Sequence, residues 1–337
     1  MISEQTAARR KRQARARWSA FAPARGLGNA HVQTLYGTFF RSPPPLPYRA
    51  ETWTTPDDDF LVVHVAEAAT PGPLAILLHG LEGSAQSPYV LGLGRRLRQL
   101  GYSILALEQR SCSGRMNRQR RLYHSGVTDD LDFVVRTAAA RWPGRPIFVG
   151  GVSLGGNQLG RWLGTHRAPD AIRAAAIVSA PFDLTVSGPH MDRRGIAYVR
   201  YFLRSLVPKA LEKERQFPGC IDREKVRRSK TFDAFDTHAT AALHGFADAT
   251  DYYSKVGCGQ YLGGTRVPTL LLAAADDPFN PGTTLPRRVA DASSYLVPCF
   301  TAHGGHVGFV AGSVRRPRYW MDDVICGFFE AHRVHED

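Results

Sequence analysis

Short, continuous apolar runs alternate with segments of helical periodicity along most of the chain. Apolar runs of this length, bounded by polar and Gly-rich segments, predict strands that are buried on both faces. We expect such strands at 74–78, 102–107, 146–150, 174–179, 267–275 and 294–300. Helical spacing predicts helices at 89–100, 128–142, 157–163 and about 320–332. Strands that alternate with helices predict an α/β fold, with a mostly parallel central sheet flanked by helices.

Two segments break this alternation. The runs at 51–54 and 60–65 flank the turn Pro56–Asp59 and predict an antiparallel hairpin. Residues 182–263 contain no clean buried strand, and we expect a helical cap inserted over the strand ends. Its apolar faces would either line an acyl pocket or pack on the core, and the pattern leaves both open. The amphipathic pieces lie at 196–206, 209–215, 223–230 and 232–243.

The strand at 146–150 leads into Gly151-Val152-Ser153-Leu154-Gly155 and then into a helix. A G-x-S-x-G motif between a buried strand and a helix is typical of the nucleophile elbow of the α/β-hydrolase fold. The serine stands on a strained turn that lifts its hydroxyl above the sheet. Glycine is needed on both sides, because a side chain there would clash. Ser153 is therefore the candidate nucleophile.

A serine nucleophile needs a base, and the base needs a carboxylate that fixes its tautomer. In this fold the acid and then the histidine follow later strands. The strand at 267–275 ends at Asp276 and Asp277, and we prefer Asp277 because it lies further into the loop. The last strand is followed by His303 and His306. His306, close to glycines that let its loop approach the elbow, is the predicted base, with His303 as the fallback.

Two backbone amides are the candidate oxyanion donors. Leu154 N–H stands at a helix N-terminus, and Leu81 N–H belongs to the loop after the first long parallel strand. His79 precedes that loop, and we interpret it as a structural histidine that bonds the loop backbone. The histidines and the five scattered cysteines show no metal-ligand spacing, so we expect neither a metal nor a cofactor.

Further motifs accompany the elbow. They are Gly28–Leu35, His79–Ser84, Tyr123–Leu131, Asn157, Leu243–Phe246, Asp251–Tyr253, Asp277–Phe279 and Gly304–Phe309. With these motifs the chain resembles, over nearly its full length, the YheT/EMB8-type α/β-hydrolases, which include the ABHD1- and ABHD3-type esterases and phospholipases. The resemblance implies a charge relay of Ser153, Asp277 and His306. It implies hydrolysis of esters, often medium-chain or phospholipid esters, or alcohol acyl transfer as in yeast relatives.

The chain departs from the pattern of this family in two places. Ser111 stands where the family has the first glycine of an R-G-C-S-G loop, and Ala242 stands where proline is usual before Leu243-His244-Gly245. Neither position touches the predicted charge relay. The departures therefore concern the shape of the substrate site.

Charge adds one feature to this picture. The 337 residues carry 43 Lys and Arg against 30 Asp and Glu, a formal net charge of +13. Basic residues gather at 9–12, 15 and 17, which predicts a solvated arm or a tether to anionic membrane. No aromatic residues interleave with them, so nucleic acid is not an expected partner. The chain then divides into a basic arm and irregular, Gly- and Pro-punctuated lead-in at 1–47, and an α/β-hydrolase domain at 48–337 with the cap at about 182–263.

The chain contains no apolar run of about 18 residues and no apolar stretch behind the N-terminal charges, which predicts neither a membrane span nor a secretory signal. The cysteines are odd in number and scattered, which favours a reducing compartment, and we expect the protein to be cytoplasmic. We predict a serine carboxylesterase that cleaves short- or medium-chain acyl or lipid esters through an acyl-enzyme. Two alternatives stay open: an alcohol acyltransferase with the same triad, and a non-enzymatic basic binding protein on a hydrolase scaffold. The sequence does not determine the substrate, the acyl length or the oligomeric state.

Overall fold

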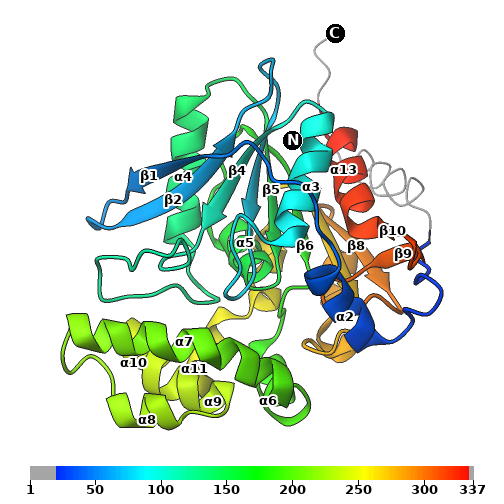
Figure 1. The fold of residues 1–337 in the computed structure, drawn as a ribbon. Coiled ribbons are helices and arrows are strands. Elements are labelled where there is room, and N and C mark those ends of the chain that lie inside the picture. Colours follow the sequence, from blue (N-terminus) through cyan, green and yellow to red (C-terminus); the bar gives the residue numbers. More distant parts are fainter. Residues whose placement is uncertain (1–19, 334–337) are drawn as a thin grey trace.

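The computed structural model describes residues 20–333, so the basic run at 9–17 lies outside the described residues. An eight-stranded sheet in the order β1-β2-β4-β3-β5-β6-β7-β8 forms the centre (Figure 1). Its strands are β1 (Arg49–Thr54), β2 (Phe60–Ala66), β3 (Leu74–Leu78), β4 (Ser103–Glu108), β5 (Ile147–Val152), β6 (Ile172–Val178), β7 (Thr269–Ala274) and β8 (Leu296–Thr301).

Strands β1 and β2 form the predicted antiparallel hairpin, and β2 runs antiparallel to β4. From β4 to β8 every neighbouring pair is parallel. The central strands read as unbroken apolar runs because side chains on both of their faces are buried. This confirms the predicted α/β fold.

Two helical layers cover the sheet. On one face, α4 (Asp129–Arg141), α5 (Leu154–Thr165) and α12 (Arg287–Ala292) pack into one apolar core. On the other face, α3 (Pro88–Gln99) and α13 (Trp320–Ala331) pack into a second core. The rigid sheet between these layers presents the carboxyl ends of its parallel strands along one edge, which is where ligands bind in open α/β sheets.

The segment between β6 and β7 is helical and lies against the strand ends (Figure 1). It has an apolar core of its own and also lines a cavity. Its elements are α6 (Leu184–Arg194), α7 (Ile196–Gln216), α8 (Arg223–Arg228), α9 (Phe232–Phe235), a π-helical turn (Asp236–Ala241), α10 (Ala242–His244), α11 (Ala249–Val256) and two 3-10 turns (Cys258–Gln260 and Leu262–Gly264).

The two pieces predicted at 196–206 and 209–215 are a single helix, α7, which runs through Pro208. Proline removes one helical hydrogen bond and crowds the preceding turn. Pro208 and Arg204, whose carbonyl loses its partner, are both exposed, so water can satisfy that carbonyl. The break predicted from the sequence is therefore absent.

The prediction of irregular structure for residues 18–47 is wrong for α2 (Ala30–Phe39), which begins at an Asn29 cap. The helix buries Gln33 and Thr34 and exposes several of its apolar residues, which is the reverse of an ordinary amphipathic helix. The expectation of β8 as the last strand also fails. A small hairpin of β9 (Val310–Ser313) and β10 (Arg316–Tyr319) follows it, and both of its strands are too short and polar for a strand pattern.

No helix within residues 20–333 is long and apolar enough to cross a membrane.

Candidate active site

Ser153 stands on the tight turn between β5 and α5. Its backbone has φ 53° and ψ −120°, a conformation that costs free energy for any residue with a side chain. A Cβ atom at Gly155 would lie 2.5 Å from the carbonyl oxygen of His79, and one at Gly151 would lie 2.4 Å from the Gly155 carbonyl. The two glycines are therefore required by close backbone contacts, and the strained turn pushes Ser153 out of the sheet edge.

The structure brings the three predicted side chains together. Ser153 Oγ lies 2.9 Å from His306 Nε2, and His306 Nδ1 lies 2.9 Å from Asp277 Oδ2. Asp277 follows β7 and His306 follows β8, so neighbouring parallel strands deliver both. The other carboxylate oxygen of Asp277 accepts the backbone N–H groups of Phe279 and Asn280, at 2.7 and 3.2 Å.

The hydrogen bonds fix what this arrangement can do chemically. The carboxylate of Asp277 accepts a hydrogen bond from His306 Nδ1–H, because an ionised carboxylate only accepts. The lone pair of His306 is then at Nε2, where it accepts the hydrogen bond of the Ser153 hydroxyl. Both His306 and Asp277 are buried, so little water competes for these bonds. A proton can pass from Ser153 to His306 without any rearrangement.

The neighbouring candidates form a separate pair. His303 is exposed, and its Nδ1 lies 3.2 Å from Asp276 Oδ2. The other oxygen of Asp276 accepts the backbone N–H of Gly305 at 2.9 Å. Asp276 and His303 therefore hold the loop that carries His306, and neither touches Ser153.

Leu81 and Leu154 line the cavity that Ser153 and His306 also line. The backbone N–H groups on either side of Leu81 donate to the hydroxyls of Tyr89 and Tyr123, both at 2.8 Å. Within residues 20–333, the N–H groups of Leu81 and Leu154 themselves have no hydrogen-bond acceptor. The loop is thus pinned on both sides of an amide that stays available to a ligand. Tyr123 lies 41 residues from Glu82 in the sequence, and sequence reasoning assigned this role to neither tyrosine.

His79 is a structural residue, as predicted. Its Nδ1 donates to the Gly80 carbonyl at 2.7 Å, and its Nε2 accepts the backbone N–H of Gln109 at 3.0 Å. Burial lowers the pKa of His79, which favours the neutral imidazole that these two bonds need. We call residues 79–84, which carry the candidate oxyanion donor Leu81, the oxyanion loop. The ring of His79 therefore ties this loop to the end of β4.

Comparison with known proteins fits this geometry. The family model of the serine aminopeptidase S33 hydrolases matches residues 70–296. The YheT protein of Escherichia coli, named as an esterase, is 34% identical over 313 residues, which cover 90% of this chain and 91% of that protein. The chain belongs to the YheT/EMB8-like α/β-hydrolases. The phospholipase ABHD3 of Mus musculus is 30% identical over 90% of this hydrolase and 76% of its own length. An esterase of Pyrococcus furiosus, only 16% identical, shares the fold with a TM-score of 0.57 over 87% of this hydrolase and 98% of that chain.

This membership confirms the resemblance stated from the motifs. It also makes the chain an enzyme of the esterase and lipase type, and the alternative of a non-enzymatic binding protein is not supported. Within residues 20–333, no three His, Cys, Asp or Glu side chains are grouped so that they could hold a metal ion.

Helix α2 supports the histidine of this hydrolase from behind. The Thr34 hydroxyl accepts the backbone N–H of His306 at 2.9 Å. The Gln33 side chain is buried and makes two hydrogen bonds to the backbone of Val310. It accepts the N–H of Val310 at 2.8 Å and donates to its carbonyl at 3.1 Å. Sequence reasoning did not predict these hydrogen bonds. The motif Gly28–Leu35, which contains Gln33 and Thr34, was the signal that could have indicated them, but no role was assigned to it.

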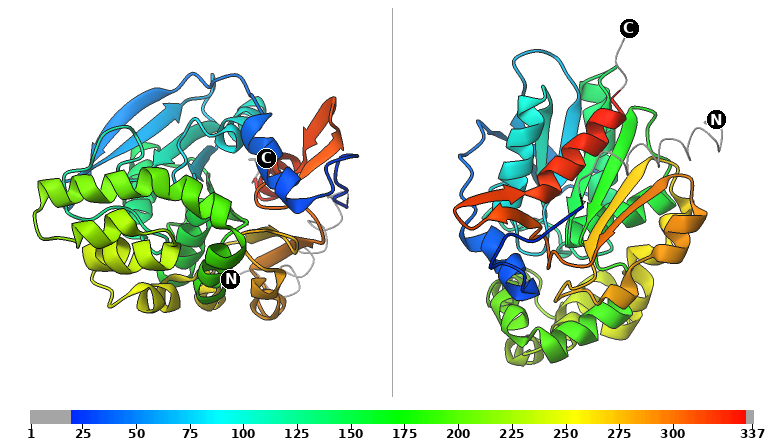
Figure 2. Two further views of the ribbon diagram at one scale, coloured as in Figure 1. Left: turned by 60° about the horizontal axis from the view of Figure 1, so that its bottom comes forward. Right: turned by 90° about the vertical axis from the view of Figure 1, so that its right-hand side faces the viewer.

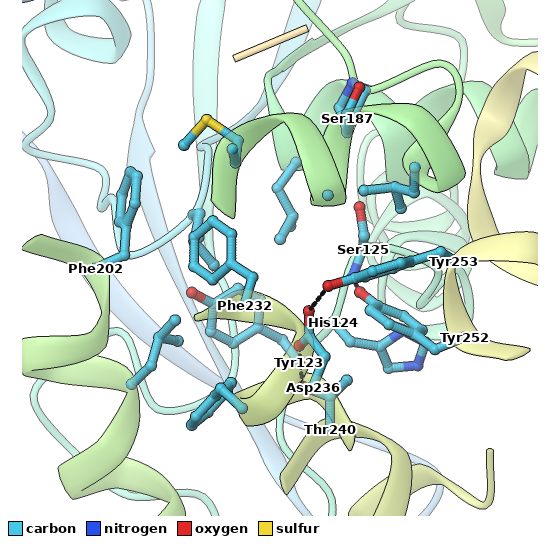
Figure 3. A pocket seen from close by; sticks show the side chains of 18 of the residues that line it. Tyr123, His124, Ser125, Ser187, Phe202, Phe232, Asp236, Thr240, Tyr252 and Tyr253 are labelled. Carbon is cyan, nitrogen blue, oxygen red and sulfur yellow. Dashed lines mark hydrogen bonds between the residues drawn. The ribbon is translucent and has the colours of Figure 1, made fainter. Parts of the chain in front are cut away.

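Two cavities of the hydrolase meet at Ser153 and His306. The inner cavity, of about 150 Å³, lies under the helical segment and is lined mainly by apolar side chains such as Leu206 and Phe232 (Figure 3). The outer cavity, of about 660 Å³, lies between α2, the oxyanion loop and the start of α7. Both cavities touch Phe279, whose ring stacks on His306 with centroids 4.1 Å apart.

One wall of the inner cavity is polar. Asp236 accepts hydrogen bonds from the hydroxyls of Thr240 and Tyr253, at 2.6 and 2.8 Å (Figure 3). Burial raises the pKa of Asp236 to about 6, and burial lowers the pKa of His244 to about 4. None of these side chains lines the outer cavity. The amphipathic pattern did not reveal Asp236, because a polar residue on a helix usually faces water.

Proposed function

We propose that this hydrolase is a carboxylesterase that cleaves short- to medium-chain acyl or lipid esters through an acyl-enzyme on Ser153. The observation that carries the proposal is the hydrogen-bonded chain from Ser153 through His306 to Asp277, set beside two unengaged amides. This combination of nucleophile, base, orienting acid and oxyanion donors is the set that acyl transfer needs.

In the first half of the proposed reaction, His306 Nε2 takes the proton of the Ser153 hydroxyl while Oγ attacks the ester carbonyl carbon. The carbonyl oxygen becomes an oxyanion, which accepts the N–H groups of Leu81 and Leu154. Asp277 stays ionised and stabilises the imidazolium. The tetrahedral intermediate then collapses, the C–O bond to the alcohol breaks, and His306 returns its proton to the departing alkoxide.

In the second half, a water molecule replaces the alcohol. His306 takes one proton from this water, and the resulting hydroxide attacks the acyl carbon of the Ser153 ester. The same two amides hold the second oxyanion. When that intermediate collapses, the proton on His306 passes to Ser153 Oγ, the carboxylic acid leaves, and the free enzyme is restored.

The two cavities support a division of the substrate. The inner cavity is mainly apolar and is bordered by the helical segment, which suits an acyl chain. The outer cavity is larger, and it suits the alcohol or head group, which must leave after the first half-reaction. The relatives named as esterase and phospholipase act on this bond type, and they support the assignment of an ester or lipid ester as substrate.

Replacing Ser153 tests the proposal. We expect Ser153→Ala to abolish hydrolysis of p-nitrophenyl butyrate and octanoate and to lose covalent labelling by a fluorophosphonate. Ser254→Ala is the matched control, because Ser254 is exposed on α11 and its hydroxyl bonds only a backbone carbonyl of its own helix. Full activity of Ser153→Ala alongside an active Ser254→Ala would refute the proposal.

Acyl transfer to an alcohol is the second candidate. The outer cavity beside Ser153 favours it, because a cavity of this size has room for an acceptor alcohol. The acyl-enzyme would be the same, and an alcohol in the outer cavity would attack in place of water. The ratio of ethyl ester to free acid, measured with ethanol present, separates the two. Mainly free acid supports hydrolysis, and mainly ethyl ester supports transfer.

A further inference from the structure

The exposed apolar side chains of this molecule are not scattered. Within residues 20–333, the large apolar side chains that stand exposed are Val32, Leu35, Phe39, Phe40, Leu100, Val186, Ile196, Tyr201 and Val314. Four of these nine come from α2 and the residue that follows it, three from α6 and α7, and one from the turn between β9 and β10. Phe39 and Phe40 are 65% and 70% exposed, which is unusual for phenylalanine.

These segments are in direct contact with one another. His31 of α2 and Tyr198 of α7 share a hydrogen bond of 3.0 Å, and the Tyr36 hydroxyl donates to the Val314 carbonyl at 3.1 Å. Figure 2 (left) shows α2 and the start of α7 next to each other on one face of the molecule. We call the exposed apolar residues of this face the apolar rim, and they are Val32, Leu35, Phe39, Phe40, Ile196, Tyr201 and Val314.

The apolar rim borders the outer cavity. Leu35, Phe39 and Tyr201 line that cavity together with Ser153 and His306. A molecule that enters from this face therefore passes between apolar side chains on its way to the candidate nucleophile. Single exposed apolar residues need no explanation, but exposed apolar residues gathered on adjoining segments around a site entrance indicate an interaction surface.

The exposed charged side chains on α6, on the first half of α7 and in the turn between β9 and β10 are arginines, and Glu82, the acidic residue that lines the outer cavity, is paired with Lys209. Exposed arginines occupy the end of α6, the first turns of α7 and the turn between β9 and β10, and Arg194 lines the outer cavity. In the described chain, none of these arginines makes an ion pair with a carboxylate, and neither α2 nor the β9–β10 hairpin contains an acidic residue. The arginines in question are Arg193, Arg194, Arg200, Arg204, Arg315 and Arg316.

We propose that the apolar rim and these arginines dock the enzyme on an anionic lipid surface. Aromatic and aliphatic side chains insert at the boundary between head groups and acyl chains, while arginines pair with anionic head groups. Charge complementarity favours a lipid surface over a second copy of this chain, because two copies would bring like-charged arginines together. None of these residues belongs to the basic run at 9–17.

Docking in this orientation sets the outer cavity against the lipid. A lipid ester would leave the surface and reach Ser153 without crossing bulk water, and this consequence rests on the proposed function. Docking itself does not rest on the proposed function, because the apolar rim and the arginines lie outside the catalytic contacts. The two are therefore measured separately, by vesicle binding and by turnover.

The test uses the full chain with Ser153→Ala, so that no lipid is cleaved, and co-sedimentation with phosphatidylcholine vesicles with and without phosphatidylglycerol. We expect binding to the anionic vesicles that weakens with salt. Phe40→Asp combined with Val314→Asp should weaken that binding about tenfold or more, because both residues belong to the apolar rim. Leu100→Asp, at an exposed apolar residue outside the rim, is the matched control and should bind like the parent.

Three further measurements keep the proposal open to refutation. Neither Phe40 nor Val314 lines a cavity, so the double variant in the Ser153 background should hydrolyse soluble p-nitrophenyl butyrate normally, which also shows that it folds. Arg315→Glu with Arg316→Glu should reduce binding to anionic vesicles and leave binding to neutral vesicles unchanged. Equal vesicle binding by parent and rim variant, or no binding by the parent, would overturn the proposal. A parent dimer that the rim variant abolishes would overturn it in favour of a protein interface.

Discussion

Ser153 owes its predicted reactivity to the tautomer of one imidazole, and Asp277 sets that tautomer. An asparagine in place of Asp277 would present its amide N–H to His306 Nδ1, which would move the imidazole proton to Nε2, where it could no longer accept the serine proton. We expect Asp277→Asn to lower kcat by about 10⁴ with little change in KM, as for comparable serine enzymes. Steady-state kinetics on p-nitrophenyl octanoate measure this.

Asp276→Asn is the control for that substitution. Asp276 is adjacent in sequence and also pairs with a histidine, but that histidine is the exposed His303. Its activity should stay within a few-fold of the parent. If both variants lost activity equally, the role assigned to Asp277 would be contradicted.

Asp236 predicts a pH dependence of stability. Its native pKa is raised to about 6 from an ordinary 3.8, so the native state keeps this proton to a higher pH than the unfolded chain does. The contribution of Asp236 to the free energy of unfolding therefore falls as pH rises from about 4 to about 6. Asp236→Asn removes this loss, and its amide can still bond with Thr240 and Tyr253.

The comparison must be between variant and parent. His79, which is buried, and His124 and His244, which are half-buried, have lowered pKa values, so their contributions change in the opposite direction over the same range. The difference in unfolding free energy, Asp236→Asn minus parent, should rise by about 2 kcal/mol between pH 4 and pH 6. Urea unfolding at several pH values measures it. A difference that does not change with pH would contradict the assignment.

At the scale of elements, α2 acts as a support for the candidate base. The Thr34 hydroxyl accepts the backbone N–H of His306, and Thr34→Val leaves that buried N–H without a partner at nearly constant volume. We expect kcat to fall about tenfold with KM unchanged, because the imidazole loses its position and the cavities do not change. Thr38→Val is the control, since that hydroxyl bonds only its own helix. Equal effects of both substitutions would contradict the positioning role.

The elements that the sequence predicted are those with a conventional hydrophobic pattern. The strands β3 to β7 are buried along almost their whole length, and β3 to β8 read as mainly apolar runs. The large helices that cover them show helical spacing. Helix α2 escaped prediction because it turns Gln33 and Thr34 inward and leaves Phe39 exposed. Its inward residues satisfy the backbone of the histidine loop, and its outward residues make the apolar rim.

The candidate site divides in the same way. The order of Ser153, Asp277 and His306 along the chain follows from strand ends, so the sequence was sufficient to name them, while their catalytic roles stay predictions. Tyr89 and Tyr123, which pin the oxyanion loop, come from segments with no local signal for that purpose. Contacts between such distant residues depend on the packing of the whole molecule, and periodicity does not report on that.

At the scale of the whole molecule, the sheet and the helical segment create two cavities with one nucleophile between them. If the inner cavity holds the acyl chain, Leu206→Trp should block it, because Leu206 lines the inner cavity alone. Each methylene that is excluded costs about 1–3 kcal/mol of transition-state binding. We therefore expect kcat/KM for p-nitrophenyl octanoate to fall about a hundredfold, with the butyrate ester changed only a few-fold.

Leu35→Trp tests the opposite assignment, in which the acyl chain occupies the outer cavity. Leu35 lines only the outer cavity, so a tryptophan there narrows the side that we assign to the alcohol. With one alcohol and a series of acyl lengths, Leu35→Trp should keep the acyl preference of the parent, whereas Leu206→Trp should shift it to shorter chains. With one acyl group and alcohols of increasing size, Leu35→Trp should shift the preference to smaller alcohols, whereas Leu206→Trp should keep the alcohol preference of the parent. A shift in acyl preference in Leu35→Trp and none in Leu206→Trp would mean that the acyl chain lies in the outer cavity, under the apolar rim, and that the alcohol leaves through the helical segment.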